Sequence, residues 1–406
     1  MVSNGTLLVL NSGSSSVKFA LFDLASHEPR RVWSGAFQRI GFDNGRFTAS
    51  DVGGTILVEE TLPVPDHVAA LDRLLDWIGR QAMQDELVAV GHRIVHGGED
   101  CDCSLLVTPE LEARLEHLIP LAPLHMPHNL AGITAVRMRR PDLVQVAAFD
   151  TAFRHSLPRI ARMTGLPRSL LDNGIRRYGF HGLSYEYVVE DMRRRSGHIA
   201  AAERIIVAHL GNGASMAAIR DGRSVETSMG FSTLAGLPMG TRPGDLDPGI
   251  LLHLMLERQV SAEELQDILY HQSGLLGLSG LSRNMADLLA RPDLPEAAEA
   301  IDFYCHHARR HLAGLTAALG GLDRLVLTGG IGANSPEIRG RICDGMDYLG
   351  LALDADRNNA QQRVVSADDS PVLIEAFKTD EELVIARHAQ NLLGAASIAG
   401  KVQNYG

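Results

Sequence analysis

Short apolar runs alternate with longer amphipathic stretches along the chain, a pattern typical of an α/β protein. Two apolar runs, residues 7–10 and 19–22, flank a turn of small residues, which predicts two strands joined as a hairpin. Apolar side chains recur at helical spacing over 68–82, and a longer helix is predicted over 297–319. Proline and glycine cluster in 236–249, which indicates a long functional loop or a break in the chain.

The hairpin pattern occurs twice, roughly half a chain length apart. Residues 205–208 form an apolar run, residues 209–215 a turn of small residues, and residues 216–219 a second apolar run. A spacing of half the chain predicts a duplicated domain, with each copy opening on such a hairpin. The period is too long for a solenoid.

Length and composition set the class of protein. With 406 residues, the chain is long enough for two or three domains, and 45% hydrophobic and 21% charged residues exclude a disordered or collagen-like chain. With a net charge of −11, the chain lacks the excess of basic residues that is typical of nucleic-acid-binding proteins. An anionic substrate must therefore be bound by a local concentration of cationic side chains. No apolar stretch is long enough to span a membrane, and the first residues do not resemble a signal peptide, which predicts a soluble cytoplasmic protein with no membrane partner.

The cysteines and a histidine cluster give little indication of a metal centre. Cys101 and Cys103 form an isolated pair with no second pair at zinc spacing. Cys305 and Cys343 lie among apolar residues, which favours core packing. The histidine-rich run 306–311 also contains arginines, and we interpret it as the polar side of a helix.

Two turns of glycine, asparagine and serine, at 11–16 and 209–215, suit the binding of phosphate. Small or missing side chains let backbone N–H groups approach the oxygens, and hydroxyls donate further hydrogen bonds. Many such turns are purely structural, but two related turns, with Lys18 just after the first, favour phosphate. Neither turn matches a Walker-type loop or opens a helix.

A third glycine loop, at 328–335, follows the apolar run 325–327. Ser335 and Pro336 then have the residue types of a helix N-cap and first helical position. A strand, glycines and a helix in succession bring backbone close to a ligand, although a tight structural turn is the alternative. The third glycine of a dinucleotide-binding fingerprint is Ser335 here, which disfavours that function.

Two arginines lie in glycine-rich segments. Arg93 lies within 91–98, and Arg242 lies within the loop 236–249. Either could bond only to carbonyl groups, but two such arginines in an acidic protein predict bidentate contacts to phosphate. His181 stands beside an aromatic residue, and Asp150 follows the strand-like run 144–149, where the end of a strand would present a carboxylate.

Residues 11–18, N-S-G-S-S-S-V-K, and 91–98, G-H-R-I-V-H-G-G, resemble the two signatures of acetate kinases. The resemblance continues in order through nearly the whole chain, at 122–125, 149–153, 178–182, 209–215, 239–242, 328–335 and 379–383. The two signatures together are highly specific, whereas the glycine loops alone would not be.

The resemblance implies a duplicated α/β fold of the ribonuclease H-like type shared by actin, Hsp70 and sugar kinases, with two domains around a central cleft. The expected domains are an N-terminal acyl kinase domain of residues 1–150 and 383–406 and a C-terminal nucleotide-binding domain of residues 151–382. The implied activity is Mg²⁺-dependent (or Mn²⁺-dependent), reversible phosphoryl transfer from ATP to acetate, giving acetyl phosphate and ADP, by a homodimer. A propionate or short-chain fatty acid kinase on the same fold is the alternative.

The resemblance also implies roles for individual residues. The catalytic residues would be Asp150, Arg93, Arg242 and His181. The residues lining the phosphates would be His125, His209, Asn212, Gly213, Ser14 and Ser16, and ATP would also contact Lys18, Gly330, Ile331 and Asn334. The substrate would contact Arg93, Val95, Leu124 and Phe180. Asn11 and Glu381 would hold the metal through water, with Glu382 as the alternative to Glu381.

Some positions depart from the pattern of the acetate kinases. Leu183 and Tyr185 replace Thr and His, and Thr233 and Ala235 replace Pro and Glu, all of which bear on the shape of the pocket. Ala333 replaces Glu in the third glycine loop, and Asn284 and Ala286 replace Asp and Arg, which bears on the preference for the nucleotide base.

The chemistry agrees with the resemblance. A carboxylate is already a nucleophile, so the protein must bring two anions together and neutralise charge on the phosphoryl oxygens, which favours direct in-line transfer with no phosphoenzyme. An ATP-driven machine like Hsp70 would need a partner-binding domain, for which no segment remains. A sugar kinase could use Asp150 as a base, but two arginines suit an anionic acceptor better.

Overall fold

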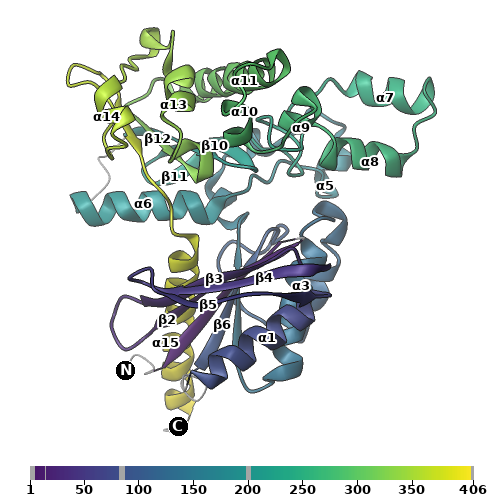
Figure 1. Cartoon of the computed structure of the whole chain (residues 1–406), viewed down its shortest axis with the longest axis vertical. Helices are drawn as coiled ribbons and strands as arrows, with labels where there is room; N and C mark the ends of the chain where they lie inside the picture. The colour runs from purple at the N-terminus through teal and green to yellow at the C-terminus, as the bar shows by residue number, and fades with distance from the viewer. Residues whose placement is uncertain (1–4, 14, 82–86, 198–202, 404–406) are drawn as a thin grey trace. The chain divides into compact units, whose positions relative to one another are not determined.

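The computed structural model describes residues 5–13, 15–81, 87–197 and 203–403 (Figure 1). The chain divides into two compact units. Unit 1 comprises Met1–Ala152 and Asp380–Gly406, and unit 2 comprises Phe153–Thr379.

Unit 1 is built on an eight-stranded sheet with the strand order β5-β4-β3-β2-β1-β6-β8-β7. Strands β1 and β2 form the predicted antiparallel hairpin, in which Asn11 lies opposite Lys18, while β6 and β8 run parallel to β1. The strands are β1 (Thr6–Ser12), β2 (Ser16–Asp23), β3 (Arg30–Gln38), β4 (Phe42–Asp51), β5 (Ile56–Val64), β6 (Leu87–Ile94), β7 (Leu105–Leu106) and β8 (Val144–Phe149).

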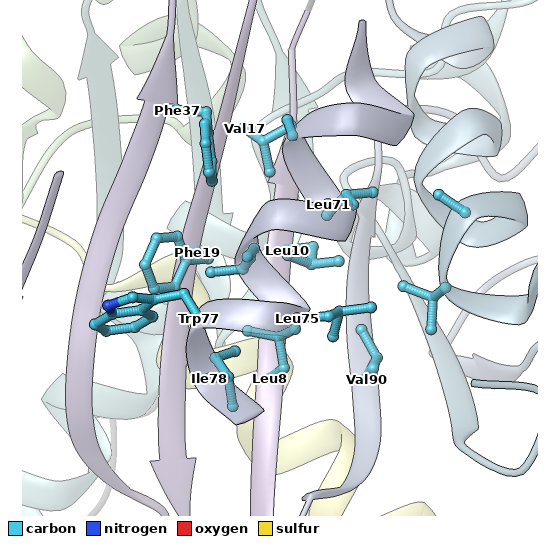
Figure 2. Packing of buried hydrophobic residues seen from close by; sticks show 14 of the residues in the cluster. Leu8, Leu10, Val17, Phe19, Phe37, Leu71, Leu75, Trp77, Ile78 and Val90 are labelled. Carbon is cyan, nitrogen blue, oxygen red and sulfur yellow. The ribbon is translucent and has the colours of Figure 1, made fainter. Parts of the chain in front are cut away.

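Helices cover both faces of this sheet. On one face, α1 (His67–Arg80) packs its apolar side against the strands, as Figure 2 shows for Leu71, Leu75 and Trp77. On the other face, α15 (Glu381–Gln403) packs so closely that a Cβ added at Gly91 would lie 2.6 Å from Cγ2 of Ile385. The remaining helices of unit 1 are α2 (Pro109–Glu116), η2 (Ile119–Leu121) and α3 (Met126–Arg139).

Unit 2 is built on a five-stranded sheet with the order β11-β10-β9-β12-β13. Its strands are β9 (Arg204–Leu210), β10 (Ala214–Arg220), β11 (Arg223–Thr227), β12 (Arg324–Thr328) and β13 (Leu373–Ala376). Its helices are α4 (Arg159–Arg162), α5 (Arg168–Asp172), α6 (Gly182–Ser196), α7 (Pro248–Leu256), α8 (Ala262–His271), α9 (Gly274–Ser279), α10 (Met285–Leu289), α11 (Pro295–Leu319), α12 (Gly329–Gly332), α13 (Pro336–Cys343), η4 (Asp347–Leu349) and α14 (Ala355–Asn359), and η3 (Ala152–Ser156) begins at the last residue of unit 1.

The duplication predicted from the two hairpins is confirmed by the topology. In unit 1 the strands β3-β2-β1-β6-β8 repeat the order of β11-β10-β9-β12-β13 in unit 2. In both series the first three strands in chain order are antiparallel neighbours, and the last two run parallel to the first. This is the ribonuclease H-like arrangement, present once in each unit.

The predicted helices are present with shifted ends. The helix predicted over 68–82 begins at His67, because the side chain of Asp66 accepts a hydrogen bond from the N–H of Ala69, and it ends at Arg80. The helix predicted over 297–319 begins two residues earlier, at Pro295, and ends at Leu319, with the left-handed Gly320 as its C-cap. The Pro/Gly-rich stretch is a loop up to Asp247, the N-cap residue of α7, which begins at Pro248.

The predicted surroundings of the cysteines and histidines are confirmed. Cys305 and Cys343 are buried, and the histidine run lies on α11 with His306 exposed. Among the helices of the described residues, none has the length and apolar character needed to cross a membrane.

A buried histidine lies in the sheet of unit 1. His92 on β6 is 2% exposed, and its Nε2 lies 2.7 Å from Oε1 of Gln145 on β8, which accepts the hydrogen bond. Burial lowers the pKa of His92 to about 4, because a charged imidazole would lose its hydration there. In the folded unit His92 therefore stays neutral near pH 6, where the histidine of the unfolded chain binds a proton with its usual pKa of about 6.5.

We predict that this histidine makes unit 1 less stable in mild acid. Between pH 7 and pH 5 the unfolded state binds the extra proton, so the free energy of unfolding should fall by about 2 kcal/mol on account of His92. Both tryptophans of the chain, Trp33 and Trp77, lie in unit 1, so urea unfolding followed by their fluorescence reports this unit. His92→Gln keeps a donor for Gln145 but does not titrate, and it should reduce the pH dependence by that amount. An unchanged pH dependence in the variant would contradict the assignment.

Candidate functional site

In unit 1, polar side chains gather at the carboxyl ends of the parallel strands. Arg93 is the second-last residue of β6, and Asp150 directly follows β8. Nε of Arg93 donates to Oδ1 of Asp150 at 3.0 Å, and Nη2 lies 2.5 Å from Oδ2, so the two side chains form a bidentate pair. Nη1 of Arg93 donates to Oδ1 of Asn11, near the end of β1, at 3.1 Å. Three neighbouring strands thus hold one guanidinium.

Glu381, the first residue of α15, completes the surroundings of Arg93. Its Oε2 lies 3.7 Å from Nε of Arg93. Burial opposes the charge of the guanidinium, but the carboxylates of Asp150 and Glu381 more than offset it and raise the pKa of Arg93. Because the Asp150 side chain is only 1% exposed, water screens this pair little. Arg93 is therefore a fixed, permanently charged group.

The segment after Arg93 is shaped by close packing. The N–H of Val95 donates to Oδ1 of Asn129 at 3.0 Å, and Nδ2 of Asn129 donates to the carbonyl of Ser12 at 2.9 Å, so this residue of α3 ties the ends of β1 and β6 together. A Cβ at Gly97 would lie 2.7 Å from Cβ of Cys101, and Gly98 has a φ of +67°. Only glycine fits the first position, and the second favours glycine strongly.

The acidic residues at the start of α15 have different surroundings. Arg31 lies 2.5 Å from Asp380 and 3.5 Å from Glu382, so these two carboxylates share a cation other than Arg93. Burial raises the pKa of Glu382, with the nearby Asp380 and Glu381 adding to the shift. Glu381 is the residue of the three whose carboxylate is directed to Arg93.

The oxygen atoms of Asn11 and Glu381 suit a hydrated divalent cation. Oδ1 of Asn11 lies 3.1 Å from Nη1 of Arg93 and Oε2 of Glu381 lies 3.7 Å from its Nε, so an amide oxygen and a carboxylate oxygen border the same guanidinium. Mg²⁺ is usually held by one or two carboxylates, waters and substrate phosphates, and not by a cage of protein ligands. The part of the chain that the structure describes contains no cluster of three or more His, Cys, Asp or Glu able to enclose a metal.

The other residues expected in the N-terminal half occupy varied environments. Ser16 begins β2 and accepts the N–H of Gly13 at its carbonyl, which closes the first turn, whereas Ser14 lies outside the described residues. Lys18 is exposed and lines a groove of about 580 Å³ with Arg31, Arg46 and Glu382. The remaining expected residues are Val95, which is buried, Leu124, which is half-buried, and His125, which caps α3.

In unit 2, two histidines are stacked beside the second glycine turn. The rings of His181 and His209 lie 4.3 Å apart, with an angle of 15° between their planes. Nδ1 of His181 lies 2.8 Å from Oγ of Ser215, and Nδ1 of His209 lies 2.8 Å from Oγ of Ser184. His181 caps α6 with a φ of +61°, a conformation that is costly for a residue with a Cβ and is concentrated at functional sites.

Gly213 lets two hydrogen-bond donors approach the turn between β9 and β10. A Cβ at this position would lie 3.0 Å from Nη2 of Arg242 and 3.3 Å from Nε2 of His181. The Arg242 loop is also bonded to this turn directly, because the N–H of Gly240 donates to the carbonyl of Asn212 at 3.1 Å. Arginine, histidine and a glycine turn thus meet at one place in unit 2.

Arg242 differs from Arg93 in having no counter-ion. Its Nη1 donates to the carbonyl of Thr233 at 2.8 Å, and within the described ranges no Asp or Glu oxygen lies within 4.0 Å of its guanidinium. Desolvation lowers the pKa of Arg242 to about 10, so it remains charged at neutral pH. A partly buried cation of this kind is suited to an anionic ligand.

The third glycine loop packs against the same turn. Gly329 has a φ of +79°, and a Cβ there would lie 2.5 Å from the carbonyl oxygen of Leu210 at the end of β9. Gly330 has nothing within 4 Å of an added Cβ, and its carbonyl accepts from Nδ2 of Asn334 at 2.8 Å. The predicted helix start is confirmed, since Ser335 caps α13, but the glycines before it form the short helix α12 instead of an open loop.

Sequence reasoning missed several supporting residues of these sites. They are Asn129, Ser184, Ser215 and Thr379, and the hydroxyl of Tyr185. Each acts through a contact between residues far apart in the sequence or on different elements. The sequence offered three signals: Ser215 lies in the turn 209–215, Thr379 lies in the matched segment 379–383, and Tyr185 departs from the pattern of the acetate kinases.

Unit 2 has a glycine turn beside an arginine with no counter-ion among the described residues, and unit 1 has a second arginine at its strand ends. Together with the repeated ribonuclease H-like topology, these features define a class of phosphate-handling proteins with a duplicated fold. Residues 6–387 match the Acetokinase family, and the chain belongs to this family.

Individual relatives agree with this assignment. The chain is 46% identical to a curated acetate kinase of Methylocella silvestris over 97% of this chain and 99% of the relative, and 47% identical to one of Rhodopseudomonas palustris over 95% and 98%. Among solved structures, an acetate kinase of Porphyromonas gingivalis has a TM-score of 0.86 and 35% identity, covering 96% of this chain and 100% of the other. A propionate kinase of Francisella tularensis has a TM-score of 0.88 and 35% identity, covering 95% and 98%.

Proposed function

We propose that this chain is an acetate kinase, which transfers the γ-phosphoryl group of ATP to acetate and forms acetyl phosphate and ADP in a reversible, direct in-line reaction. Membership of the acetokinase family supports the reaction class. The observation that carries the proposal is the charge of Arg242, which has a glycine turn beside it and no carboxylate partner among the described residues.

The chemistry requires charge neutralisation more than proton transfer. One oxygen of acetate attacks the γ-phosphorus while the bond to the β–γ bridging oxygen breaks, and ADP leaves with that electron pair. Acetate is already ionised, so no general base is required. Arg93 and Arg242 neutralise charge on the two anions, and His181 donates to the phosphoryl oxygens. Asp150 orients Arg93 through its bidentate pair and is not needed as a base.

The glycine segments of unit 2 bind the nucleotide. His209, Asn212 and Gly213 contact the phosphates of ATP, a role supported by their position around the turn after β9. Gly330, Ile331 and Asn334 border the adenosine, a role supported by the open space above Gly330. Lys18, Ser14, Ser16 and His125 contribute to the phosphate side in unit 1.

Asn11 and Glu381 are the residues that would hold Mg²⁺, or Mn²⁺, through water. The bound ion would supply positive charge to the phosphates of ATP. Oδ1 of Asn11 and Oε2 of Glu381 both lie near Arg93, whereas Glu382 lies near Arg31. This favours Glu381 over Glu382 as the carboxylate that holds the metal.

The acid that is phosphorylated is small. Contacts with the acyl group are assigned to Val95 and Leu124 in unit 1 and to Phe180 in unit 2. The backbone N–H of the buried Val95 is fixed by Asn129. A longer tail would be crowded by the Val95 side chain, so acetate should be favoured over propionate by about ten-fold in kcat/KM.

The reaction is tested by trapping its product. With ATP, Mg²⁺ and acetate, added hydroxylamine should convert acetyl phosphate to acetyl hydroxamate, and propionate should react about ten-fold less efficiently. Reactions without an acid, and with glycerol in place of acetate, are the controls. ADP release that is independent of acetate would contradict the proposal, and a preference for propionate would contradict the role of Val95.

The two arginines should be needed mainly in the transition state. Arg93→Ala and Arg242→Ala should each lower kcat by about two decades or more, because each removes a charge that stabilises the phosphoryl oxygens. Arg→Lys should restore little activity, since a point charge does not reproduce the guanidinium fork. Steady-state kinetics give kcat and KM for each variant and so separate the two roles. A rise in KM with unchanged kcat would mean that the arginines only bind substrate.

We further propose that the enzyme is a homodimer in which a second copy covers α7. This helix consists almost entirely of apolar residues, yet none of its residues is buried. Ile250, Leu252 and Leu256 are 46%, 59% and 65% exposed. Contiguous exposed apolar side chains of this kind mark an interaction surface, and symmetric dimers are the commonest oligomers.

Charged residues on α7 should separate the two copies. The double variant Leu252→Glu with Leu256→Glu should elute with the mass of one chain in size-exclusion chromatography with light scattering, whereas the unaltered protein should show the mass of two chains. Met138→Glu, which changes an apolar side chain that is 75% exposed in unit 1, is the matched control and should stay dimeric. A double variant that retained the mass of two chains would exclude α7 as the interface.

A further inference from the structure

Behind the stacked histidines of unit 2 lie two chains of hydroxyl groups. Oγ of Ser215, which contacts Nδ1 of His181, also contacts the hydroxyl of Tyr185. Oγ of Ser184, which contacts Nδ1 of His209, lies 3.0 Å from Oγ1 of Thr379. Each imidazole therefore has its Nδ1 on a serine that is itself bonded to a further hydroxyl.

The Nε2 atoms of both rings are directed to the glycine turn. Nε2 of His181 lies 3.3 Å from the position of an added Cβ on Gly213, and Nε2 of His209 lies 4.0 Å from that on Gly211. In each ring, Nδ1 thus faces a serine hydroxyl and Nε2 faces the glycine turn. Which nitrogen carries the hydrogen decides whether the ring offers the turn a donor or a lone pair.

Counting hydrogens along the first chain determines its direction. The contact between Tyr185 and Ser215 allows either hydroxyl to donate, and the more acidic phenol is the favoured donor. Oγ of Ser215 makes no other side-chain hydrogen bond among the described residues, so its own hydrogen then finds its acceptor at Nδ1 of His181. Nδ1 accepts, and the ring hydrogen resides on Nε2. Tyr185 is 3% exposed and Ser215 is fully buried, so water does not compete for these bonds.

We propose that Tyr185 is a positioning residue that acts through Ser215 to keep His181 in the tautomer with hydrogen on Nε2. The ring then presents a donor, next to Arg242, to the place where the proposed function puts the transferring phosphoryl oxygens, so the benefit for catalysis rests on that function. The opposite tautomer would direct a lone pair at those oxygens and repel them.

The local structure holds the members of the chain in register. Tyr185 lies one helical turn after His181, and its N–H donates to the carbonyl of His181 at 3.2 Å. Its ring packs against Phe153, with the centroids 5.9 Å apart. Ser215 lies on β10 opposite His209 on β9, which is stacked on His181. Removing only the hydroxyl of Tyr185 therefore leaves the packing in place.

The tautomer can be measured directly by NMR. In protein labelled with ¹⁵N-histidine, long-range ¹H–¹⁵N correlation spectra distinguish hydrogen on Nε2 from hydrogen on Nδ1, and the signals absent from His181→Asn identify His181. The unaltered enzyme should show the Nε2–H form. Tyr185→Phe should lower the ratio of Nε2–H to Nδ1–H by about ten-fold, because Ser215 loses the donor that polarises its hydroxyl toward Nδ1. Ser215→Ala, a second variant, should also shift the ratio.

Kinetics provide the second readout. Tyr185→Phe should lower kcat by about ten-fold and change KM for ATP by less than about two-fold, because a donor is lost mainly in the transition state. Tyr304→Phe is the matched control. Tyr304 is also fully buried in unit 2, and its hydroxyl has no hydrogen-bond partner among the described residues. This control should change neither the tautomer nor kcat.

The outcomes separate this proposal from the proposed function. An unchanged His181 tautomer in Tyr185→Phe and in Ser215→Ala would overturn the role of Tyr185, even in an enzyme that makes acetyl phosphate. A shifted tautomer in a protein that forms no acetyl hydroxamate would uphold the hydroxyl chain and overturn the acetate kinase function.

Discussion

A guanidinium that stays charged with no counter-ion in the described part of the chain is the constraint on which the site of unit 2 depends. Arg242 has given up part of its hydration, and its one described polar bond from Nη1 is to the neutral carbonyl of Thr233. An isolated partly buried charge is costly, so the folded protein is left in a state that an anion stabilises. The glycine turn beside it leaves space for that anion, because Gly213 places no side chain between the backbone and the two donors.

Arg93 in unit 1 differs from Arg242 because it is paired with a carboxylate. Asp150 and Asn11 fix its orientation before any substrate binds, so little reorganisation is needed during reaction. In each unit the first hairpin and the neighbouring parallel strand end at the same edge of the sheet, where β1 and β6 correspond to β9 and β12. Arg93 lies on β6, whereas Arg242 comes from the loop between β11 and α7, so the two arginines do not occupy equivalent positions of the repeat.

Much of this could be read from the sequence, because the signals were local. The two hairpins and the start of α13 at Ser335 depend on neighbouring residues, and each is found in the structure, whereas the glycines at 329–332 form the short helix α12. The contacts that orient the functional groups could not be read in this way. Asn129 joins two strand ends, and Tyr185 reaches His181 through Ser215 on another element. Such contacts are set by tertiary packing and have no periodicity or spacing that marks them.

The central claim is that opposed charges and fixed donors let acetate attack the phosphorus directly, without a phosphorylated side chain. The most direct test is the stereochemical course of transfer from ATP made chiral at the γ-phosphorus with oxygen isotopes and sulfur. A single in-line displacement predicts inversion of configuration at phosphorus in acetyl phosphate. Retention of configuration would require two displacements through a phosphoenzyme and would contradict the account.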